Sequence, residues 1–564
     1  MNVAAAIADV LADEGIPAVF GVPASETMQI VVAAAARGIA TYHARHEQAA
    51  LGMADGYARV SGRVGVAVVG RGPGFTNGLN AMITAAKARS PVLVVAGELP
   101  TTVAGDPQAS ARHVLAMKNV DQAGIAAALG ISHMGVCSAR TARADVAAAL
   151  AAAAKGATVL LTVPTDVAQA EANVPADLQP DRADIVQHPG VQMPNAADIA
   201  AVADLIEEGW TARRPVILAG RGARGAAARG QLRALGDATG ALLANSLLAK
   251  GAFAGSEFDI GTVGTLATPV ATELATGCDL LLAFGASLNP FTTYGGDLFG
   301  RARVVQFDTD ERAFGRYLPA DMAVSGDAER AAGLLAGEIA RRGYRAEGYR
   351  TRAARALLSR QRKEQATPSL GSDGALHPAA LMEALDAVLP ADRIVVVDAG
   401  AHMSFAARGL SVRDPQSFMT TTVDYASVGS AQGVAMGAAL AAPDRTTVLV
   451  IGDGGMMMSL PDLQTAARYR LPLVTIVCND CAFGQEVQIL RMAGLPDDIA
   501  RYPAVEFAAL ASDMGVDAIK VDSPTALARL QDELTSPAGP LLADCRVSGQ
   551  VWGEHTGLVS RLGR

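Results

Sequence analysis

The chain has 564 residues, which is long enough for roughly three or four domains of ordinary size. Half of the residues are hydrophobic but only 4% are aromatic, so Ala, Val and Leu must build the core, as in parallel sheets covered by helices. A formal net charge of −9, without an extended Lys/Arg stripe, argues against a nucleic-acid-binding protein.

The first of three α/β segments covers residues 1–171. Apolar runs of strand length alternate there with Ala-rich helical stretches. A linker that contains Pro and Asp begins at Ala172 and breaks the pattern. The expected strands of this first segment are Ala18–Phe20, Val64–Val69, Val92–Val95 and Thr158–Thr162.

Two further segments repeat the alternation of strand and helix. The second covers residues 190–345 and the third residues 370–551, with a basic helical connector from Arg341 to Lys363 between them and a tail at 552–564. We therefore expect an α/β protein of three doubly wound parallel-sheet domains. The expected strands are Val216–Leu218, Leu280–Phe284 and Val304–Phe307 in the second segment, and Ile394–Val397, Val448–Ile451, Val474–Val477 and Leu541–Ala543 in the third.

No membrane segment or leader is recognisable in the sequence. No apolar run reaches the roughly 18 to 20 residues of a membrane span, and no stretch has the pattern of a signal peptide. The five cysteines are too scattered for a disulfide framework. We expect a cytoplasmic protein.

Glu47 opens a helix in the segment TYHARHEQAALGMADGYARVSG. The positions that follow it, Ala50, Leu51 and Ala54, are small or apolar. The carboxylate either turns toward a buried surface, where it can share a proton, or stays solvated in the first turn, where the helix dipole stabilises it.

A glycine-rich turn, VVGRGPGFTNGLNAM, follows the strand Val64–Val69 and carries Arg71, Phe75 and Asn77. A turn of this kind is a generic ligand loop. Arg71 either binds a carboxylate, phosphate or sulfonate of a substrate through paired hydrogen bonds or faces solvent at the edge of the loop. Phe75 is a candidate lining residue of an apolar pocket, with Phe483 and the run Met456–Met458.

The middle segment contains a literal GxGxxG after a strand, in PVILAGRGARG. This spacing is typical of a dinucleotide-binding turn, and hence of an NAD-dependent oxidoreductase. Such a site needs an acidic residue about 20 positions further on, where this chain has Ala244 and Asn245. The missing acid argues against the oxidoreductase hypothesis.

The third segment contains VIGDGGMMMSLPDLQTAARYRLPLVTIVCND, which indicates strand, helix and strand. Parallel strands bring their carboxyl ends to one edge of a sheet, so Asp453 and Asn479 should meet there. A carboxylate, an amide oxygen and main-chain carbonyls are ligands that Mg²⁺ accepts, with the remaining positions left to phosphate oxygens and water. The alternatives are an ordinary turn in which Asp453 caps a helix and, for Cys478 and Cys481, a redox or zinc CxxC, although no second Cys/His pair accompanies it.

Together these motifs resemble the thiamine diphosphate (ThDP)-dependent enzymes of the acetolactate synthase and 2-oxo acid decarboxylase group, over nearly the whole chain. RHEQAALGMADGYAR and GPGFTNG are similar to the family's pyrimidine-binding domain, and GDGG with ND to its diphosphate motif. The resemblance implies that Glu47 hydrogen-bonds the aminopyrimidine. It makes Asp453, Asn479 and the main-chain oxygen of Cys481 the Mg²⁺ ligands.

Further cofactor contacts are implied by VDAGAHMSFAA and DYASVGSAQGVAMGA. Val428 takes the place of the bulky apolar residue that bends the cofactor, and it is smaller than the family's usual Met. The other residues that the resemblance places at the cofactor are Gly400, His402, Ala426, Gly454, Gly455 and Asn479.

The resemblance implies decarboxylation of a 2-oxo acid, such as pyruvate, and transfer of the acyl carbanion equivalent to a second carbonyl. The Gly-Pro-Gly turn favours this carboligase of acetolactate synthase type. Ser25 in VFGVPASE matches a substrate-contacting Ser of decarboxylases and favours the alternative, a non-ligating 2-oxo acid decarboxylase or an acyloin lyase. A non-catalytic ThDP-binding homologue is the alternative of another class, and the intact Glu47, Asp453 and Asn479 argue against it.

The resemblance also implies a homodimer or homotetramer, with ThDP between Glu47 of one chain and Asp453 of its neighbour. Acetolactate synthases hold FAD in the corresponding middle domain. In GASLNPFTTYGG, Ser287 replaces the Arg of FAD-bearing relatives, which argues against stable FAD binding.

Overall fold

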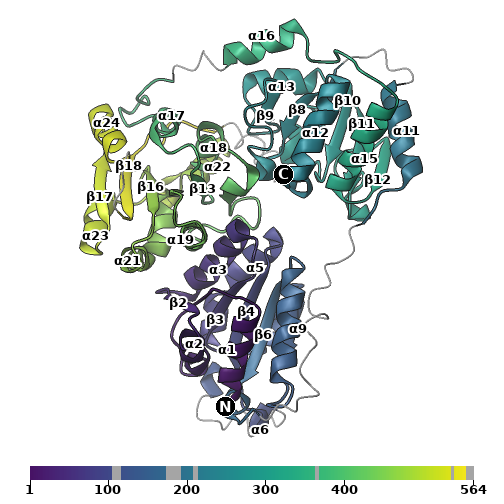
Figure 1. Ribbon diagram of the computed structural model, residues 1–564. Coiled ribbons are helices and arrows are strands. Elements are labelled where there is room, and N and C mark those ends of the chain that lie inside the picture. The colour runs from purple at the N-terminus through teal and green to yellow at the C-terminus, as the bar shows by residue number, and fades with distance from the viewer. Residues whose placement is uncertain (105–115, 173–191, 208–213, 362–366, 535–538, 554–564) are drawn as a thin grey trace.

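The computed structural model describes residues 1–104, 116–172, 192–207, 214–361, 367–534 and 539–553. It contains three parallel sheets of six strands each, one from each segment of the chain (Figure 1). The predicted fold class is therefore confirmed, while the domain boundaries remain predictions. Most of the predicted linker after Ala172, the end of the basic connector and nearly all of the tail lie outside the described residues.

The first sheet has the strand order β2-β1-β3-β4-β6-β5. Because successive side chains of a strand point to opposite faces, Val19 and Val66 pack with α1, α2 and α9, whereas Phe20 and Ala67 pack with α3 and α5. The strands are β1 (Ala18–Gly21), β2 (Ala40–His43), β3 (Gly65–Val69), β4 (Val92–Glu98), β5 (Ser132–Gly135) and β6 (Thr158–Pro164). The helices are α1 (Val3–Asp13), α2 (Met28–Ala35), α3 (Glu47–Ser61), α4 (Pro73–Asn77), α5 (Leu79–Ala88), α6 (Thr101–Ala104), α8 (Gln122–Ala128), α9 (Ala142–Ala154) and α10 (Thr165–Gln169).

The third sheet repeats this topology, with the order β14-β13-β15-β16-β18-β17. Its strands are β13 (Ile394–Val397), β14 (Phe418–Thr420), β15 (Thr447–Gly452), β16 (Leu473–Asn479), β17 (Asp517–Val521) and β18 (Leu541–Arg546). Its helices are α17 (Pro378–Val388), α18 (Met403–Gly409), α19 (Ala431–Ala441), α20 (Asp453–Ser459), α21 (Leu463–Arg468), α22 (Gly484–Met492), α23 (Phe507–Asp513) and α24 (Pro524–Glu533).

The middle sheet has a different order, β12-β11-β10-β7-β8-β9. Its strands are β7 (Pro215–Ala219), β8 (Leu242–Asn245), β9 (Asp259–Thr262), β10 (Leu280–Phe284), β11 (Arg303–Asp308) and β12 (Met322–Ser325). The helices are α11 (Ala196–Glu207), α12 (Ala226–Thr239), α13 (Pro269–Thr276), α14 (Pro290–Thr293) and α15 (Ala328–Arg341), and α16 (Arg352–Gln361) leads toward the third domain.

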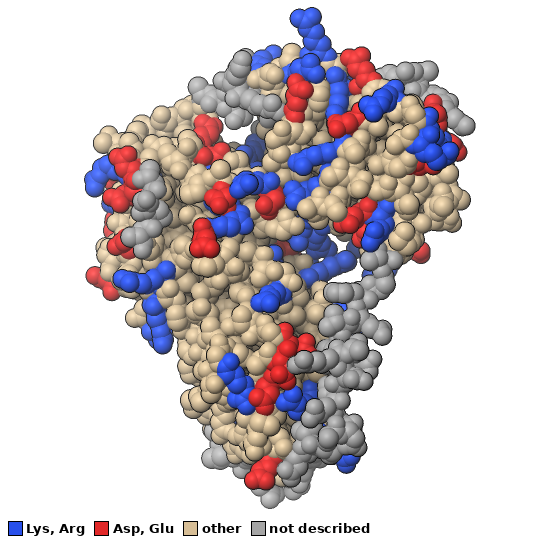
Figure 2. Space-filling model, viewed as in Figure 1, with Lys and Arg blue, Asp and Glu red and all other residues tan. Residues whose placement is uncertain are grey.

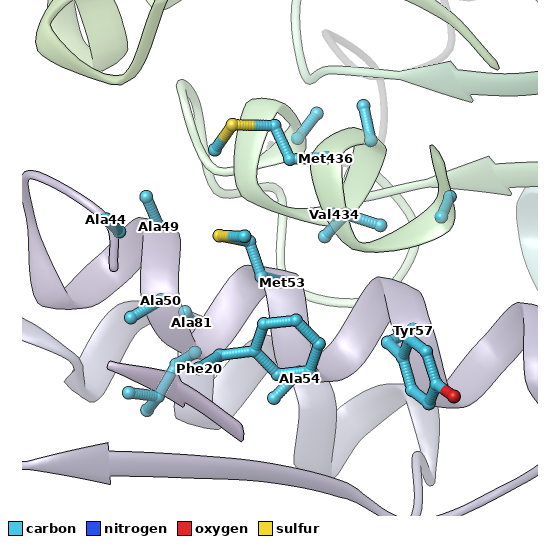
Figure 3. Close-up of a cluster of buried hydrophobic side chains, with 14 of the residues drawn as sticks. Phe20, Ala44, Ala49, Ala50, Met53, Ala54, Tyr57, Ala81, Val434 and Met436 are labelled. Carbon is cyan, nitrogen blue, oxygen red and sulfur yellow. The ribbon is translucent and has the colours of Figure 1, made fainter. Parts of the chain in front are cut away.

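The first and third domains share one hydrophobic core, in which α3 crosses α19 (Figure 3). Met53 of α3 points toward α19, which contributes Val434 and Met436 to this cluster, whereas Tyr57 of α3 packs against Phe20 of β1. Glycines allow the two backbones to touch: a Cβ at Gly56 would lie 1.9 Å from the Val434 carbonyl oxygen. The helix pair therefore fixes how the start of α3, at Glu47, lies against the third domain.

Polar contacts surround this crossing. Arg59 on α3 forms ion pairs with Asp55 at 2.7 Å and, across the interface, with Asp424 at 2.8 Å. Although burial opposes it, these two carboxylates hold the pKa of Arg59 above its usual value. The Arg45 main-chain N–H also donates to Asp462 at 2.8 Å. The interface thus combines apolar packing with paired charges.

Within the described part of the chain, we find no helix with the length and hydrophobicity needed to span a bilayer. On the face shown in Figure 2, Lys and Arg side chains are interspersed with Asp and Glu side chains over all three domains.

Candidate active site

A pocket opens at the carboxyl edge of the third sheet, which we call the sheet-edge pocket. It lies between the ends of the neighbouring strands β13 and β15. From β13 the chain continues to β14 on one side of this pair, and from β15 it continues to β16 on the other side. Open α/β sheets bind ligands at such a reversal of strand order. The lining residues used below are Gly400, His402, Val428, Asp453, Gly454, Gly455, Asp480, Ala482 and Phe483.

Two carboxylates face this pocket from neighbouring strand ends. Asp453 follows β15 and Asp480 follows β16. Burial raises the pKa of Asp453 to about 6, and burial together with the charge of Asp453 raises the pKa of Asp480 to about 7. A buried and a partly buried carboxylate that face one pocket form a favourable place for a divalent cation.

Asn479 does not take part in this pair, and the prediction that its oxygen meets Asp453 needs correction. Its Nδ2 donates to Asp544 at 2.8 Å and to the Val505 carbonyl at 3.0 Å, and its Oδ1 accepts from Arg546 at 3.1 Å. The side chain is 1% exposed and does not line the sheet-edge pocket. Neighbouring residues at a strand end point in opposite directions, so Asp480 reaches the pocket where Asn479 cannot.

Cys481 has a left-handed backbone conformation, with φ of +58°. Its carbonyl oxygen, the predicted third metal ligand, accepts a hydrogen bond from the Tyr502 N–H at 3.1 Å, and the neighbouring Ala482 lines the pocket instead. Burial raises the pKa of the Cys481 thiol, as it does for the Cys478 thiol. The main-chain metal ligand remains a prediction.

Glycines make room for His402 in the pocket. A Cβ at Gly400 would lie 2.9 Å from His402 Cε1, and a Cβ at Gly452 would lie 3.2 Å from its Nδ1. His402 is 8% exposed and faces the pocket from the loop after β13. The loops after β13 and β15 therefore need both glycines to bring the imidazole beside Asp453.

The turn with Ala426 and Val428 is fixed by Asp398, a residue that sequence reasoning missed. Asp398 is fully buried and accepts from the Gly429 N–H at 2.7 Å and the Ala431 N–H at 3.2 Å. Burial raises its pKa to about 6. Ala426 has φ of +56°, a conformation that costs a non-glycine residue free energy and is common at functional turns.

Glu47 lies at the start of α3, half-buried, with its carboxylate held by the α4 turn. Oε2 accepts from Asn77 Nδ2 at 3.0 Å, and a Cβ at Gly74 would lie 3.4 Å from Oε1. Asn80 joins this corner to the third domain, because its Nδ2 donates to Ser427 at 2.6 Å and lies 3.5 Å from the Gln48 oxygen. Asn80 therefore contacts both Gln48, which is next to Glu47, and Ser427, which is next to Val428.

Glu47 itself is not among the lining residues of the sheet-edge pocket, which all come from the third domain. Of the residues predicted to bind the metal and the diphosphate, this pocket brings together Gly400, His402, Asp453, Gly454 and Gly455. Glu47 lies instead at the corner held by Asn77 and Asn80, and its role at the pyrimidine remains a prediction.

Arg71 is buried at 3% exposure, so the solvent-facing alternative is wrong. Its Nη1 donates to Asn119 at 2.7 Å, and its Nε lies 3.8 Å from Glu26, which also pairs with Lys118 at 2.8 Å. A role in substrate binding remains a prediction. Ser25 is exposed at the same edge of the first sheet and donates to Glu26 at 3.2 Å.

Phe75 does not line the pocket, contrary to expectation. Its ring is 1% exposed in the core shared by the first and third domains. The α4 turn directs Asn77 toward Glu47 while Phe75 anchors the turn in the core. Phe483 does line the pocket, whereas Met456 is fully buried.

The glycines of the GxGxxG in the middle domain serve loop packing. A Cβ at Gly220 would lie 2.2 Å from the Gly285 carbonyl oxygen, and one at Gly222 would lie 2.9 Å from Gly285 Cα. The turn after β7 thus packs closely against the loop after β10, which accounts for both glycines. The expectation that the middle domain does not hold FAD stably remains a prediction.

Comparison with known proteins places the whole chain in one family. Three family models of thiamine pyrophosphate enzymes match it: the N-terminal TPP binding domain at residues 1–129, the central domain at 199–335 and the C-terminal TPP binding domain at 398–545. An acetolactate synthase large subunit of Parasynechococcus marenigrum is 31% identical over 96% of this chain and 87% of that protein.

Two other relatives carry different names. A sulfoacetaldehyde acetyltransferase of Castellaniella defragrans is 28% identical over 93% of this chain and 88% of that protein. A probable 2-ketoarginine decarboxylase of Pseudomonas aeruginosa is 30% identical over 85% of this chain and 82% of that protein. The chain therefore belongs to the thiamine pyrophosphate enzyme family, as a ThDP-dependent enzyme that forms or cleaves carbon–carbon bonds and is related to the acetolactate synthase large subunits.

Proposed function

We propose that the protein is a ThDP- and Mg²⁺-dependent carboligase of acetolactate synthase type. It decarboxylates a 2-oxo acid such as pyruvate and transfers the acyl carbanion equivalent to a second carbonyl compound. The observation that carries the proposal is the sheet-edge pocket, where the buried Asp453, the partly buried Asp480, a glycine-lined loop and His402 meet at the switch point of the third sheet. The acetolactate synthase relative, matched over 96% of the chain, supports the ligating reaction.

Asp453 and Asp480 are the proposed metal ligands. Asp453 Oδ2 is buried and has no hydrogen-bond partner of acceptable geometry in the described part of the chain, which fits a carboxylate that awaits a cation. Mg²⁺ binding would favour the deprotonated form of both carboxylates, which together would offset the charge of the cation. Asn479 supports this site indirectly, since its bonds to Asp544 and Val505 hold the end of β16.

Gly400, His402, Gly454 and Gly455 would bind the diphosphate. The glycines leave the main chain accessible, and the imidazole can donate a hydrogen bond to a phosphate oxygen. Val428 would support the cofactor's bend and the Ala426 carbonyl would accept from its amino group. When bound, ThDP would supply a carbanion that adds to the 2-oxo acid and a cationic ring that takes up the electron pair left when CO₂ departs.

Glu47 would hold a proton at the pyrimidine ring. Asn77 orients one carboxylate oxygen at 3.0 Å, which leaves the other oxygen, beside Gly74, for the ligand. A positioned carboxylate can share its proton in this way without a diffusing acid. The role of Glu47 is thus to keep the cofactor in its reactive tautomer.

A non-ligating decarboxylase is the second candidate. The exposed Ser25 at the edge of the first sheet and the relative named as a probable 2-ketoarginine decarboxylase favour it. In that case a proton, not a second carbonyl, ends the reaction, and an aldehyde leaves. Neither candidate requires a nucleotide in the middle domain.

A substrate screen tests the proposal. Purified protein with ThDP and Mg²⁺ is given 2-oxo acids singly and in pairs with aldehydes or further 2-oxo acids, and CO₂ and products are followed by NMR. We expect pyruvate to release CO₂ and yield a ligated product, with Glu47→Gln as the inactive control. Aldehyde as the sole product would replace the carboligase with the decarboxylase, and the absence of CO₂ from every 2-oxo acid would reject both.

A further inference from the structure

Tyr502 lies beside the proposed metal site on a loop that is tied to the metal-binding turn. Its N–H donates to the Cys481 carbonyl at 3.1 Å, and the Phe483 N–H donates to the Ala500 carbonyl at 2.9 Å. Ala482 and Arg501 form an antiparallel bridge between these two bonds. The loop that carries Tyr502 is therefore held in register with the turn that follows Asp480.

The Tyr502 side chain is directed at the start of α20. Its ring packs edge-on against Phe483, with centroids 5.6 Å apart and planes at 77°. A Cβ at Gly454 would lie 3.1 Å from the Tyr502 hydroxyl and 2.5 Å from Phe483 Cε1. Only glycine at position 454 lets the phenol come this close to the main chain next to Asp453.

Two buried polar atoms remain unsatisfied at this point. The Tyr502 hydroxyl and Asp453 Oδ2 are both buried, and the described residues offer neither a hydrogen bond of acceptable geometry. A tyrosine hydroxyl can donate one hydrogen bond, and a carboxylate oxygen can accept it. A donor and an acceptor that the described residues leave unsatisfied thus lie close together at the pocket wall.

From this arrangement, and on the basis of the proposed Mg²⁺ site, we propose that Tyr502 is a positioning residue for the metal. Its hydroxyl donates to the Asp453 carboxylate when the cation binds and holds the carboxylate in the orientation that the cation requires. Tyr502 does not line the pocket, so it acts through Asp453 and not on the substrate. Donors of this kind commonly change metal affinity by about 10- to 100-fold.

The test compares Tyr502→Phe, which removes only the hydroxyl, with Tyr317→Phe, which makes the same change at a half-exposed tyrosine of the middle domain. Calorimetry measures Mg²⁺ affinity of the full-length protein in saturating ThDP, and Mn²⁺ affinity without ThDP is measured by electron paramagnetic resonance. We expect Tyr502→Phe to weaken both affinities about tenfold or more, with an unchanged unfolding temperature in the absence of metal. Tyr317→Phe should match the wild type.

Wild-type metal affinity in Tyr502→Phe would overturn the inference. A loss of affinity accompanied by a lower unfolding temperature without metal would overturn it as well, because the hydroxyl would then act through the fold. Asp453→Ala separates this failure from a failure of the proposed function. If Asp453→Ala keeps the wild-type affinity, the metal site itself is wrong, whereas loss in Asp453→Ala with no loss in Tyr502→Phe rejects only the role of the tyrosine.

Discussion

Glu47 carries the chemical prediction at the residue scale. Glu47→Gln keeps the size of the side chain and its contact with Asn77 but cannot share a proton. We expect turnover to fall by about 10²- to 10⁴-fold, the usual contribution of one acid–base group. The thermal shift produced by ThDP and Mg²⁺ should stay close to that of the wild type, and turnover at the wild-type rate would remove Glu47 from the mechanism.

Asp480 and Asn479 provide a matched pair of neighbours for a second prediction. Asp480→Ala removes a carboxylate from the pocket, so Mg²⁺-dependent ThDP binding, measured by calorimetry, should be lost. Asn479→Ala removes buried hydrogen bonds to Asp544 and Val505, so it should lower the free energy of unfolding by about 1–3 kcal/mol while metal affinity persists. The opposite pattern would restore Asn479 as the ligand.

The same pair shows what the sequence could and could not predict about the site. The spacing of GDGG and ND located the two strand ends correctly, but the choice between residues 479 and 480 depends on which face of β16 each side chain takes. A shift of one position reverses that face, and only the pairing of β16 with β18, which places Asn479 beside Arg546, fixes it.

At the scale of elements, the strands expected from the sequence are all present, and those it missed are mostly edge strands. β2 and β5 have no fully buried residue, and β17 has only one, because an edge strand contacts one neighbour and is partly solvated. Their weak apolar pattern is indistinguishable from a loop. β8 is the exception, since LLAN is buried throughout but too short to stand out from its Ala-rich surroundings.

The crossing of α3 and α19 leads to a prediction about stability. Gly56→Ala places a methyl group 1.9 Å from the Val434 carbonyl oxygen, so the helices must separate, and we expect a loss of about 1–3 kcal/mol in the free energy of unfolding. Gly337→Ala is the matched control, because α15 leaves open space around that position and alanine should stabilise it by about 0.5–1 kcal/mol. Urea unfolding measures both. Equal effects in the two variants would show that close packing at the crossing contributes nothing.

At the scale of the whole molecule, the three-domain order followed from composition and alternating apolar runs, but the contact between the first and third domains did not. Gly52 and Gly56 of α3 pack against Gly433 and Gly437 of α19, and a side chain at these positions would collide with the facing backbone. The sequence alone does not reveal this role. Contacts between residues some 380 positions apart in sequence leave no local pattern. The structure brings Glu47 near the turn at Ser427 within one chain. An experiment is therefore needed to decide whether the Glu47 and Asp453 of one active site come from the same chain or from two chains.

We predict that the active unit is at least a homodimer whose sites each combine Glu47 of one chain with Asp453 of the other. The sheet-edge pocket is lined by the third domain alone, so the pyrimidine end must be supplied from outside that domain. Mixing Glu47→Gln chains with Asp453→Ala chains tests which chain supplies Glu47 to each site. Each mixed dimer then contains one site with both lesions and one with neither, and random exchange of equal amounts should restore about a quarter of the wild-type activity. If each chain instead completes its own site through the α3 and α19 contact, every site carries one lesion, and the mixture stays inactive even when exchange between labelled subunits is verified.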